Sequence, residues 1–237
     1  MWDIIDTGIS SAEANMQKDA DLLETLDEAK NPIIHFYDWE GDCATYGYFV
    51  DPAEYLQLDK VREKKLHLAK RPTGGGIIFH LWDFAFSVLV PASSPHFSEN
   101  TLDNYSFVNK AVLEAIGDFM RTKEKLQIIE RDLTSFDRQS ERFCMARPTK
   151  YDVVYAGKKI AGAAQRKTKK GFLHQGSISM VLPCREYLKE VLQPKTQVLD
   201  AIFSFSAAIL CKDATKSHVS EAKRDLRLLL HKHLSKE

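Results

Sequence analysis

The sequence lacks an excess of charge of either sign. Lys and Arg together number 33 and Asp and Glu number 33, so the formal net charge is zero at pH 7. Nucleic-acid-binding domains are typically basic, and acidic tails are typical of disordered partner-binding segments. The balance therefore predicts no nucleic-acid partner, and any charged function must come from a local site.

Cysteines are few and far apart, and no C-x-x-C pair or Cys–His cluster occurs. The four cysteines are Cys43, Cys144, Cys184 and Cys211. Their spacing disfavours both a zinc site and a disulfide framework, and it is typical of proteins in a reducing compartment. We therefore predict no metal centre and no disulfide.

Long apolar runs are also missing. No run approaches the ~18 residues that a membrane span needs, and residues 1–6 lack the cationic start of a secretory signal. The chain of 237 residues is 44% hydrophobic, which is enough for one large domain. These features predict a soluble, cytoplasmic protein without a membrane partner.

No Walker loop and no G-x-G-x-x-G fingerprint is present, although glycines stand in a row at Gly74, Gly75 and Gly76. Arg71 precedes them, and a β-branched and aromatic run that ends at His80 follows. Because glycine has no Cβ, this loop lets backbone approach a ligand closely, and the neighbouring cation favours an anion such as phosphate or carboxylate. The alternative is a glycine-rich hairpin with an incidental arginine.

Segments with strand and helix periodicity follow one another without strict alternation, which is typical of a mixed α+β fold. Strands are expected at 2–7, 33–37, 43–50, 84–90, 126–129, 151–155, 159–165 and 172–182. Helices are expected after Ser10, at 51–65, 104–122, 185–192 and 198–211, and from Ser217 onward. We expect a mixed, largely antiparallel sheet flanked by helices. It forms a single domain over 1–237, with 198–237 as a helical C-terminal extension packed on it.

Two side chains are candidates for chemistry. Lys159 follows a tight turn and precedes the small residues Gly162 and Ala163, so its ammonium could lie along a phosphate or a polarised carbonyl. The alternative is a solvated hairpin lysine. Cys144 lies near Arg142 and Arg147, and nearby cations would favour the nucleophilic thiolate. A buried, inert thiol is the alternative.

Three motifs in order resemble the lipoate–protein ligase and octanoyltransferase family, whose catalytic fold is shared with biotin–protein ligases. They are Arg71-x-x-Gly74-Gly75-Gly76-x-x-x-His80, then Gly157-Lys158-Lys159-Ile160-Ala161-Gly162-Ala163-Ala164-Gln165, then His174-Gln175-Gly176-Ser177-Ile178. The resemblance covers about residues 1–195.

The resemblance implies a lipoyl or octanoyl chain in an apolar tunnel and Lys159 at the acyl carbonyl and phosphate oxygens. The implied contacts of the acyl group and its nucleotide or carrier are Arg71, Thr73, Gly74, Gly75, Gly76, His80, Gly162, Ala163, His174, Gly176 and Ser177. The implied acceptor is a lysine of an apo lipoyl domain, from 2-oxoacid dehydrogenases or the glycine-cleavage H protein. The basic run at 166–170 is predicted to contact such a domain.

The resemblance leaves the branch of the family open. The triple glycine favours an ATP-dependent lipoate–protein ligase, which would use ATP and Mg to form lipoyl-adenylate, and this is our first prediction. The alternative is an octanoyltransferase that takes octanoate from an acyl carrier protein onto Cys144. It is favoured because Cys144 stands eight positions before Asp152, with Pro148 between them. A non-catalytic protein that binds lipoate or lipoyl domains is a third possibility.

Overall fold

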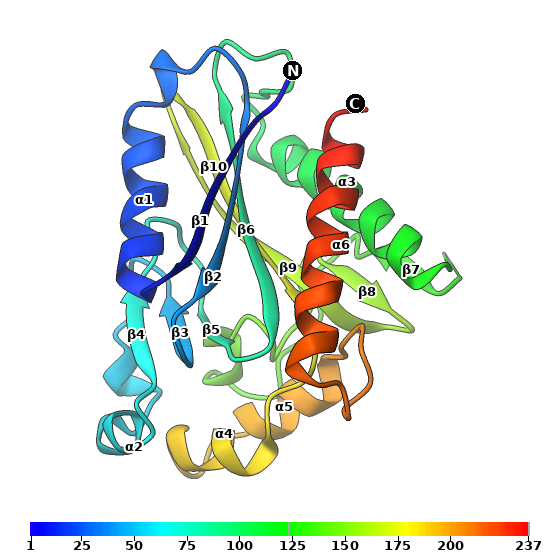
Figure 1. Ribbon diagram of the computed structural model, residues 1–237. Coiled ribbons are helices and arrows are strands. Elements are labelled where there is room, and N and C mark those ends of the chain that lie inside the picture. The colour runs from blue at the N-terminus through cyan, green and yellow to red at the C-terminus, as the bar shows by residue number, and fades with distance from the viewer. Residues whose placement is uncertain (123, 237) are drawn as a thin grey trace.

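The computed structural model describes residues 1–122 and 124–236. A twisted seven-stranded sheet forms its centre, with helix α1 (Ala12–Glu24) on one side and helices α3 (Thr101–Met120) and α6 (Lys216–Leu234) on the other (Figure 1). The strands are, in spatial order, β1 (Asp3–Ser10), β2 (Ile33–Trp39), β6 (Asp83–Pro91), β10 (Gly171–Ser179), β9 (Lys158–Thr168), β8 (Val153–Tyr155) and β7 (Leu126–Ile128). Strands β1 and β2 run parallel, and every other neighbouring pair is antiparallel.

A second, three-stranded sheet lies beside the first. Its strands are β4 (His67–Lys70), β3 (Cys43–Tyr46) and β5 (Ile77–His80), with β3 in the middle. The short helices α2 (Leu58–Glu63), α4 (Arg185–Val191) and α5 (Val198–Phe205) contribute to the apolar cluster on this sheet. The chain passes from the small sheet to the large one through the turn between β5 and β6, so His80 and Asp83 lie where the sheets meet.

The main core lies between the large sheet and helices α3 and α6. Phe84, Phe86 and Phe172 contribute from the sheet, and all three are fully or almost fully buried. Helix α6 packs along this core with a stripe at three- and four-residue spacing, as expected of an amphipathic helix. The stripe consists of Val219, Ala222, Leu226, Leu230 and Leu234.

The predicted fold class is confirmed: the fold is mixed α+β, with a largely antiparallel sheet flanked by helices. Three predicted elements differ most from the structure in their extent. The strand predicted at 43–50 ends at Tyr46 because Gly47 turns toward the glycine loop, and the helix predicted at 51–65 is regular only from Leu58. The helix predicted at 198–211 ends at Phe205, where Ala207 N donates instead to Lys159 O at 2.9 Å. Among the described residues, no helix is long and apolar enough to cross a membrane.

Truncating a buried leucine of helix α6 tests how far this helix supports the fold. Leu226 is fully buried, so Leu226→Ala leaves a cavity in the main core. We expect it to lower the free energy of unfolding by about 2–5 kcal/mol in urea denaturation. Leu228→Ala is the matched control, because Leu228 is 68% exposed on the same helix, and it should change stability by less than about 0.5 kcal/mol. Equal effects of the two changes would show that α6 is not an integral part of the core.

Candidate active site

Arg71 holds the glycine loop in place from inside. Its side chain is 4% exposed, and its guanidinium donates hydrogen bonds to four oxygens of the surrounding backbone and side chains. They are Thr45 O at 2.9 Å, Thr45 Oγ1 at 2.9 Å, Gly74 O at 3.0 Å and Gly76 O at 2.7 Å. Arg71 Nε has no hydrogen-bond partner among the described residues, and Arg71 lines the narrow cavity described below, so its contact with a ligand anion stays a prediction.

The glycines of the loop are required by backbone-to-backbone contacts. A Cβ at Gly47 would lie 2.0 Å from Gly75 O, and a Cβ at Gly76 would lie 2.1 Å from Arg142 O. Gly75 has a φ of +87°, a region that favours glycine. Gly74 differs from these, since a Cβ there would meet nothing within 4 Å. The loop is therefore held between two other segments of the chain.

One of those segments carries Cys144. Its N–H donates to Ile77 O at 2.9 Å, which fixes the cysteine beside the first residue of β5. A Cβ built on Gly75 would lie 3.3 Å from Arg71 Nη2 and 3.8 Å from Cys144 Sγ, so the guanidinium and the thiol flank the same point. Burial lowers the pKa of Arg71, and the adjacent Cys144 partly opposes that shift. Arg71 is thus a cationic neighbour of the thiol that sequence proximity did not indicate.

Lys159 forms a buried ion pair with Asp152. Nζ lies 2.6 Å from Asp152 Oδ2, and both side chains are about 5% exposed or less. Burial raises the pKa of Asp152, and Lys159 and the N–H and hydroxyl of Thr149 partly offset this. A Cβ at Gly162 would lie 2.4 Å from Lys159 Cε, so only glycine leaves room for the lysine to lie across β9. The sequence identified Lys159 and Gly162 but did not identify Asp152 as a site residue.

A second buried chain of polar contacts passes through His80. His80 Nε2 lies 2.8 Å from Thr45 Oγ1, and His80 Nδ1 lies 2.7 Å from Asp83 Oδ2. Ser177 also donates to Asp83 Oδ2, at 2.6 Å. Burial alone would raise the pKa of Asp83, but His80 and Ser177 hold it below its usual value. The chain joins the small sheet to β10, and it continues to Arg71 through Thr45.

A third series of hydrogen bonds connects the glycine loop to helix α1. Thr73 Oγ1 donates to Gln175 Oε1 at 2.6 Å, and Gln175 Nε2 donates to Asp19 Oδ2 at 2.6 Å. The other oxygen of Asp19 lies 2.7 Å from His35 Nδ1. Because a carboxylate only accepts hydrogen bonds, Asp19 fixes the Gln175 amide with its oxygen toward Thr73. Sequence reasoning missed Asp19, since nothing local distinguishes it from the other acids of helix α1.

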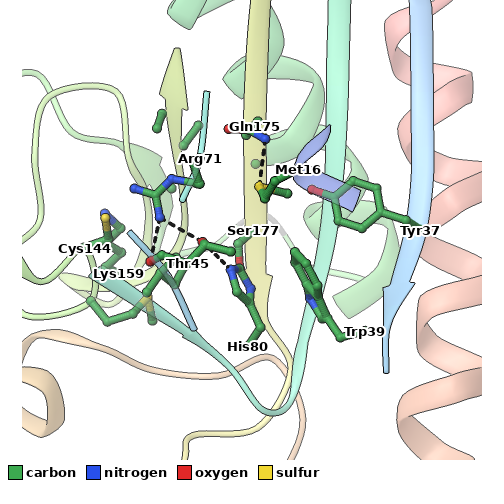
Figure 2. A pocket seen from close by; sticks show the side chains of 16 residues that line it. Met16, Tyr37, Trp39, Thr45, Arg71, His80, Cys144, Lys159, Gln175 and Ser177 are labelled. Carbon is green, nitrogen blue, oxygen red and sulfur yellow. Dashed lines mark hydrogen bonds between the residues drawn. The ribbon is translucent and has the colours of Figure 1, made fainter. Parts of the chain in front are cut away.

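These groups surround a narrow cavity of about 40 Å³. Met16, Tyr37 and Trp39 contribute apolar walls, and Cys144 and Lys159 lie toward the opposite side, as Figure 2 shows. Other predicted site residues that line it are Arg71, His80, Gly162, Ala163, Gly176 and Ser177. A larger cavity of about 270 Å³ adjoins it and is lined by Gly74, Gly75, Gly76, Tyr105, Glu141 and Arg147. Cys144, Lys159 and Ala163 line both cavities, so the thiol and the ammonium lie at their junction.

Two predicted site residues have positions that packing explains. His174 lines neither cavity; it is fully buried, with its ring centroid 5.4 Å from that of Tyr105. Gly176 does line the narrow cavity, but a Cβ there would lie 2.3 Å from Phe86 Cζ, so the close approach of Phe86 also requires glycine. Within the described part of the chain, no group of three or more His, Cys, Asp or Glu side chains is placed to hold a metal.

The basic run at 166–170 is largely paired within the molecule. Lys167 Nζ lies 2.7 Å from Glu99 Oε2, and Lys170 Nζ lies 3.2 Å from Asp27 Oδ1. Arg166 is exposed and donates to Pro72 O at 3.3 Å, beside the start of the glycine loop. Arg166 and Lys169 have no acidic partner among the described residues, and the contact of the run with a lipoyl domain stays a prediction.

The chain is similar in sequence to known proteins of one family. The family model described as the lipoyl protein ligase A/B catalytic domain matches residues 11–204. An octanoyltransferase LipM from Staphylococcus epidermidis is 33% identical over 187 residues, which are 75% of this chain and 65% of that protein's own length. An octanoyltransferase LipM from Bacillus anthracis is 30% identical over 211 residues, which cover 87% of this chain and 75% of that protein.

Solved structures support the fold. A crystal structure of lipoate-protein ligase A bound with ATP matches with a TM-score of 0.68 at 22% identity, over 97% of this chain and 85% of that one. The putative lipoate protein ligase Ta0514 from T. acidophilum, with bound lipoic acid, matches with a TM-score of 0.68 at 21% identity. That match covers 98% of this chain and 86% of the other. At these identities the likeness shows a shared fold.

The contact between Gly76 and Arg142 predicts different effects of alanine within the glycine triplet. Gly76→Ala places a methyl group against Arg142 O and must displace the segment that carries Cys144. We expect a loss of about 1–3 kcal/mol in stability and a change in the alkylation rate of Cys144, measured by peptide mass mapping. Gly74→Ala is the control, and it should leave both quantities nearly unchanged. If the two variants behave alike, the loop is not packed as described.

The burial of His174 predicts a pH dependence of stability. Burial lowers its pKa from the usual 6.5 to about 3, so the folded protein keeps this ring neutral while the unfolded chain takes up a proton. Stability must therefore fall as pH drops below 6.5, by about 2 kcal/mol at pH 5 from this group. His174→Gln should remove that part of the pH dependence, measured as the wild-type-minus-variant difference in urea unfolding at pH 7.5 and pH 5. A difference that does not change with pH would contradict this assignment.

Proposed function

The chain belongs to the lipoyl protein ligase A/B catalytic-domain family, and on that premise we propose that it is an octanoyltransferase. In this proposal, Cys144 takes an octanoyl group from a carrier-protein thioester and passes it to a lysine of an apo lipoyl domain. The main observation behind the proposal is the position of Cys144 and Lys159 at the junction of the narrow and the larger cavity. An eight-carbon acyl chain is larger than the narrow cavity of about 40 Å³, so its apolar walls would have to move apart to admit the chain. Bound there, the chain would bring its carbonyl to a thiol and an ammonium together.

The first half-reaction follows from the groups around Cys144. The Arg71 guanidinium flanks the same point as the Cys144 thiol, so a cation stands beside the sulfur that acts as the nucleophile in this proposal. The thiolate attacks the thioester carbonyl of the donor and forms a new C–S bond. The C–S bond to the carrier breaks, and the carrier leaves as a thiol with the proton that Cys144 gave up. The products are octanoyl-Cys144 and the free carrier.

The second half-reaction forms the amide. The neutral amine of the acceptor lysine attacks the octanoyl carbonyl, the C–S bond to Cys144 breaks, and the thiolate returns with loss of one proton from the amine. In both halves, negative charge develops on the carbonyl oxygen. The Lys159 ammonium is held by Asp152 in the same junction, and a fixed cation there would stabilise that charge in the transition state.

The ligase was our first prediction from the sequence, and the comparisons favour the alternative. The relatives at 30% identity or more that are described above are named octanoyltransferases. The ligases that match in structure are 21–22% identical, and that likeness extends to the fold alone. ATP and Mg would be substrates and cofactor of the ligase only, and the proposed transfer uses neither.

Intact-mass spectrometry of an apo lipoyl domain tests the proposal. The protein is incubated with octanoyl carrier protein without ATP, and separately with lipoate and Mg-ATP. We expect octanoylation without ATP and an octanoyl adduct on the wild-type enzyme. Cys144→Ala should abolish both, because it removes the proposed nucleophile. Cys211→Ala is the matched control, since Cys211 is exposed and lies outside both cavities, and it should retain full activity.

Two other outcomes would contradict the proposal. Modification that needs ATP and survives Cys144→Ala would establish the ligase and leave Cys144 without a covalent role. Binding of the lipoyl domain with no modification under either condition would establish the non-catalytic binding protein.

Lys159→Ala tests the stabilisation of the developing charge. Loss of a fixed cation at an oxyanion typically lowers kcat by about 10²–10³-fold. The transfer rate from octanoyl-Cys144 to the domain should fall by that order while the protein remains folded. A variant with near-normal transfer would exclude Lys159 from the catalytic step.

A further inference from the structure

The loop after strand β3 exposes two aromatic rings next to the candidate site. Phe49 is 90% exposed and Tyr48 is 51% exposed, and their ring centroids lie 5.1 Å apart in an edge-to-face arrangement. Large aromatic side chains are usually at least partly covered in a folded domain, and their exposure next to polar surface is typical of interaction sites. No described segment of this chain covers Phe49.

The backbone of this loop is fixed to the glycine loop. Gly47 N donates to Gly76 O at 3.3 Å, and Tyr48 N donates to Thr73 O at 3.0 Å. Gly47 also packs directly on Gly75, where any side chain would overlap the carbonyl oxygen. On the far side of the rings, Val50 is buried in the core of the small sheet. The exposure of Tyr48 and Phe49 therefore comes from a held backbone and not from a loose loop.

One cation lies over the Tyr48 ring, and a second contacts the start of the glycine loop that holds the Tyr48 backbone. Lys70 Nζ lies 4.1 Å from the centroid of the Tyr48 ring, a cation–π distance. Arg166 donates to Pro72 O at 3.3 Å, one residue before the Thr73 carbonyl that holds Tyr48. Both cations are exposed, and neither has an acidic partner among the described residues, whereas Lys167 is paired with Glu99. We call Tyr48, Phe49, Lys70 and Arg166 the rim patch.

We propose that the rim patch is the docking surface for the acyl-acceptor protein, an acidic lipoyl domain with an apolar side chain near its target lysine. The proposal rests on the proposed function in one respect, that the acceptor is a protein. Charge complementarity assigns the partner, because unpaired cations beside exposed aromatic rings fit a surface that carries carboxylates around an apolar residue. The position of the rim patch favours the acceptor as the partner. The glycine loop that supports the rim patch also lines the larger cavity, which Cys144 and Lys159 line as well.

The acceptor is also the protein that both branches of the family require. Whether the acyl group arrives on a carrier or as an adenylate, a lysine of a folded domain must reach the carbonyl at the junction of the cavities. Exposed aromatic side chains on a fixed backbone are good anchors for such an encounter, because they lose little conformational entropy on binding.

Direct binding measurements test the rim patch without relying on catalysis. The wild-type protein, Phe49→Ser and Lys70→Glu are titrated with an apo lipoyl domain by isothermal calorimetry at low and physiological salt. We expect Phe49→Ser to weaken binding about tenfold or more. Lys70→Glu should weaken it chiefly at low salt, where charge attraction is least screened. Leu228→Ser is the matched control, since Leu228 is 68% exposed on α6, and it should leave the affinity unchanged.

The same variants are then followed through the two half-reactions. Loading of the enzyme from octanoyl-coenzyme A should stay within about twofold of wild type, as should the melting temperature. The KM for the lipoyl domain should rise about tenfold, with kcat little changed. If the enzyme does not load, octanoyl-adenylate is supplied instead, so a failure of the Cys144 mechanism is seen separately from a failure of the rim patch.

Three results would overturn the proposal. One is an unchanged affinity and KM for the lipoyl domain in both variants. Another is an equal loss in Leu228→Ser, which would point to a general effect of exposed apolar groups. The third is self-association of the wild type through Phe49, seen by analytical ultracentrifugation and abolished by Phe49→Ser, which would assign the rim patch to a second copy of this chain.

Discussion

The buried guanidinium of Arg71 is the contact on which the site depends. Its N–H groups donate hydrogen bonds to Thr45 in the small sheet and to the carbonyl oxygens of Gly74 and Gly76. Removing a charged group from water is unfavourable unless its donors are used, so the guanidinium and the loop carbonyls stabilise each other only in this arrangement. Cys144 is fixed by its contact with Ile77 directly after that loop. The shape of the loop therefore sets the position of the thiol as well.

The chain as a whole has no net charge, but its candidate site contains buried charged side chains, and each of them has its own partner. Lys159 is paired with Asp152, Asp83 with His80, and Asp19 with the donors around it. A buried ion pair contributes little net stability, but it holds its members in a defined geometry. Lys159 is thus kept at the junction of the two cavities with its charge available. A developing oxyanion would share that ammonium with Asp152 rather than recruit a mobile side chain from solvent.

The proposed reaction and the rim patch both depend on the backbone packing of the glycine loop. The glycine loop contacts backbone on two sides, because Gly47 packs on Gly75 and Gly76 packs on Arg142, and no Cβ would fit at Gly47 or Gly76. On one side this contact positions the segment of Cys144, and on the other it exposes Tyr48 and Phe49. A single loop thereby relates the place where an acceptor protein would dock to the place where the acyl carbonyl would lie.

Much of the fold was predicted from local sequence. The stripe of helix α6 and the hairpin of β8 and β9 follow from periodicity and turn residues, because these depend on neighbours within a few positions. The errors fall where distant backbone intervenes. The strand predicted at 43–50 ends early because Gly47 packs on Gly75, and the helix predicted at 198–211 ends where Ala207 bonds to Lys159. Neither contact has a signature in the residues next to it.

The sequence by itself was sufficient for the family and the fold class, because the motifs are contiguous and their spacing is specific. It also named Lys159, Cys144 and the glycine loop as candidate site residues, and their roles stay predictions. Tertiary structure alone decided what these residues touch. Arg71 holds the loop, Lys159 is paired with Asp152, and the support of Thr73 by Asp19 through Gln175 joins segments more than a hundred residues apart. The physical reason is that side-chain type encodes which hydrogen bonds and contacts are possible, whereas the partners depend on where folding brings distant backbone together.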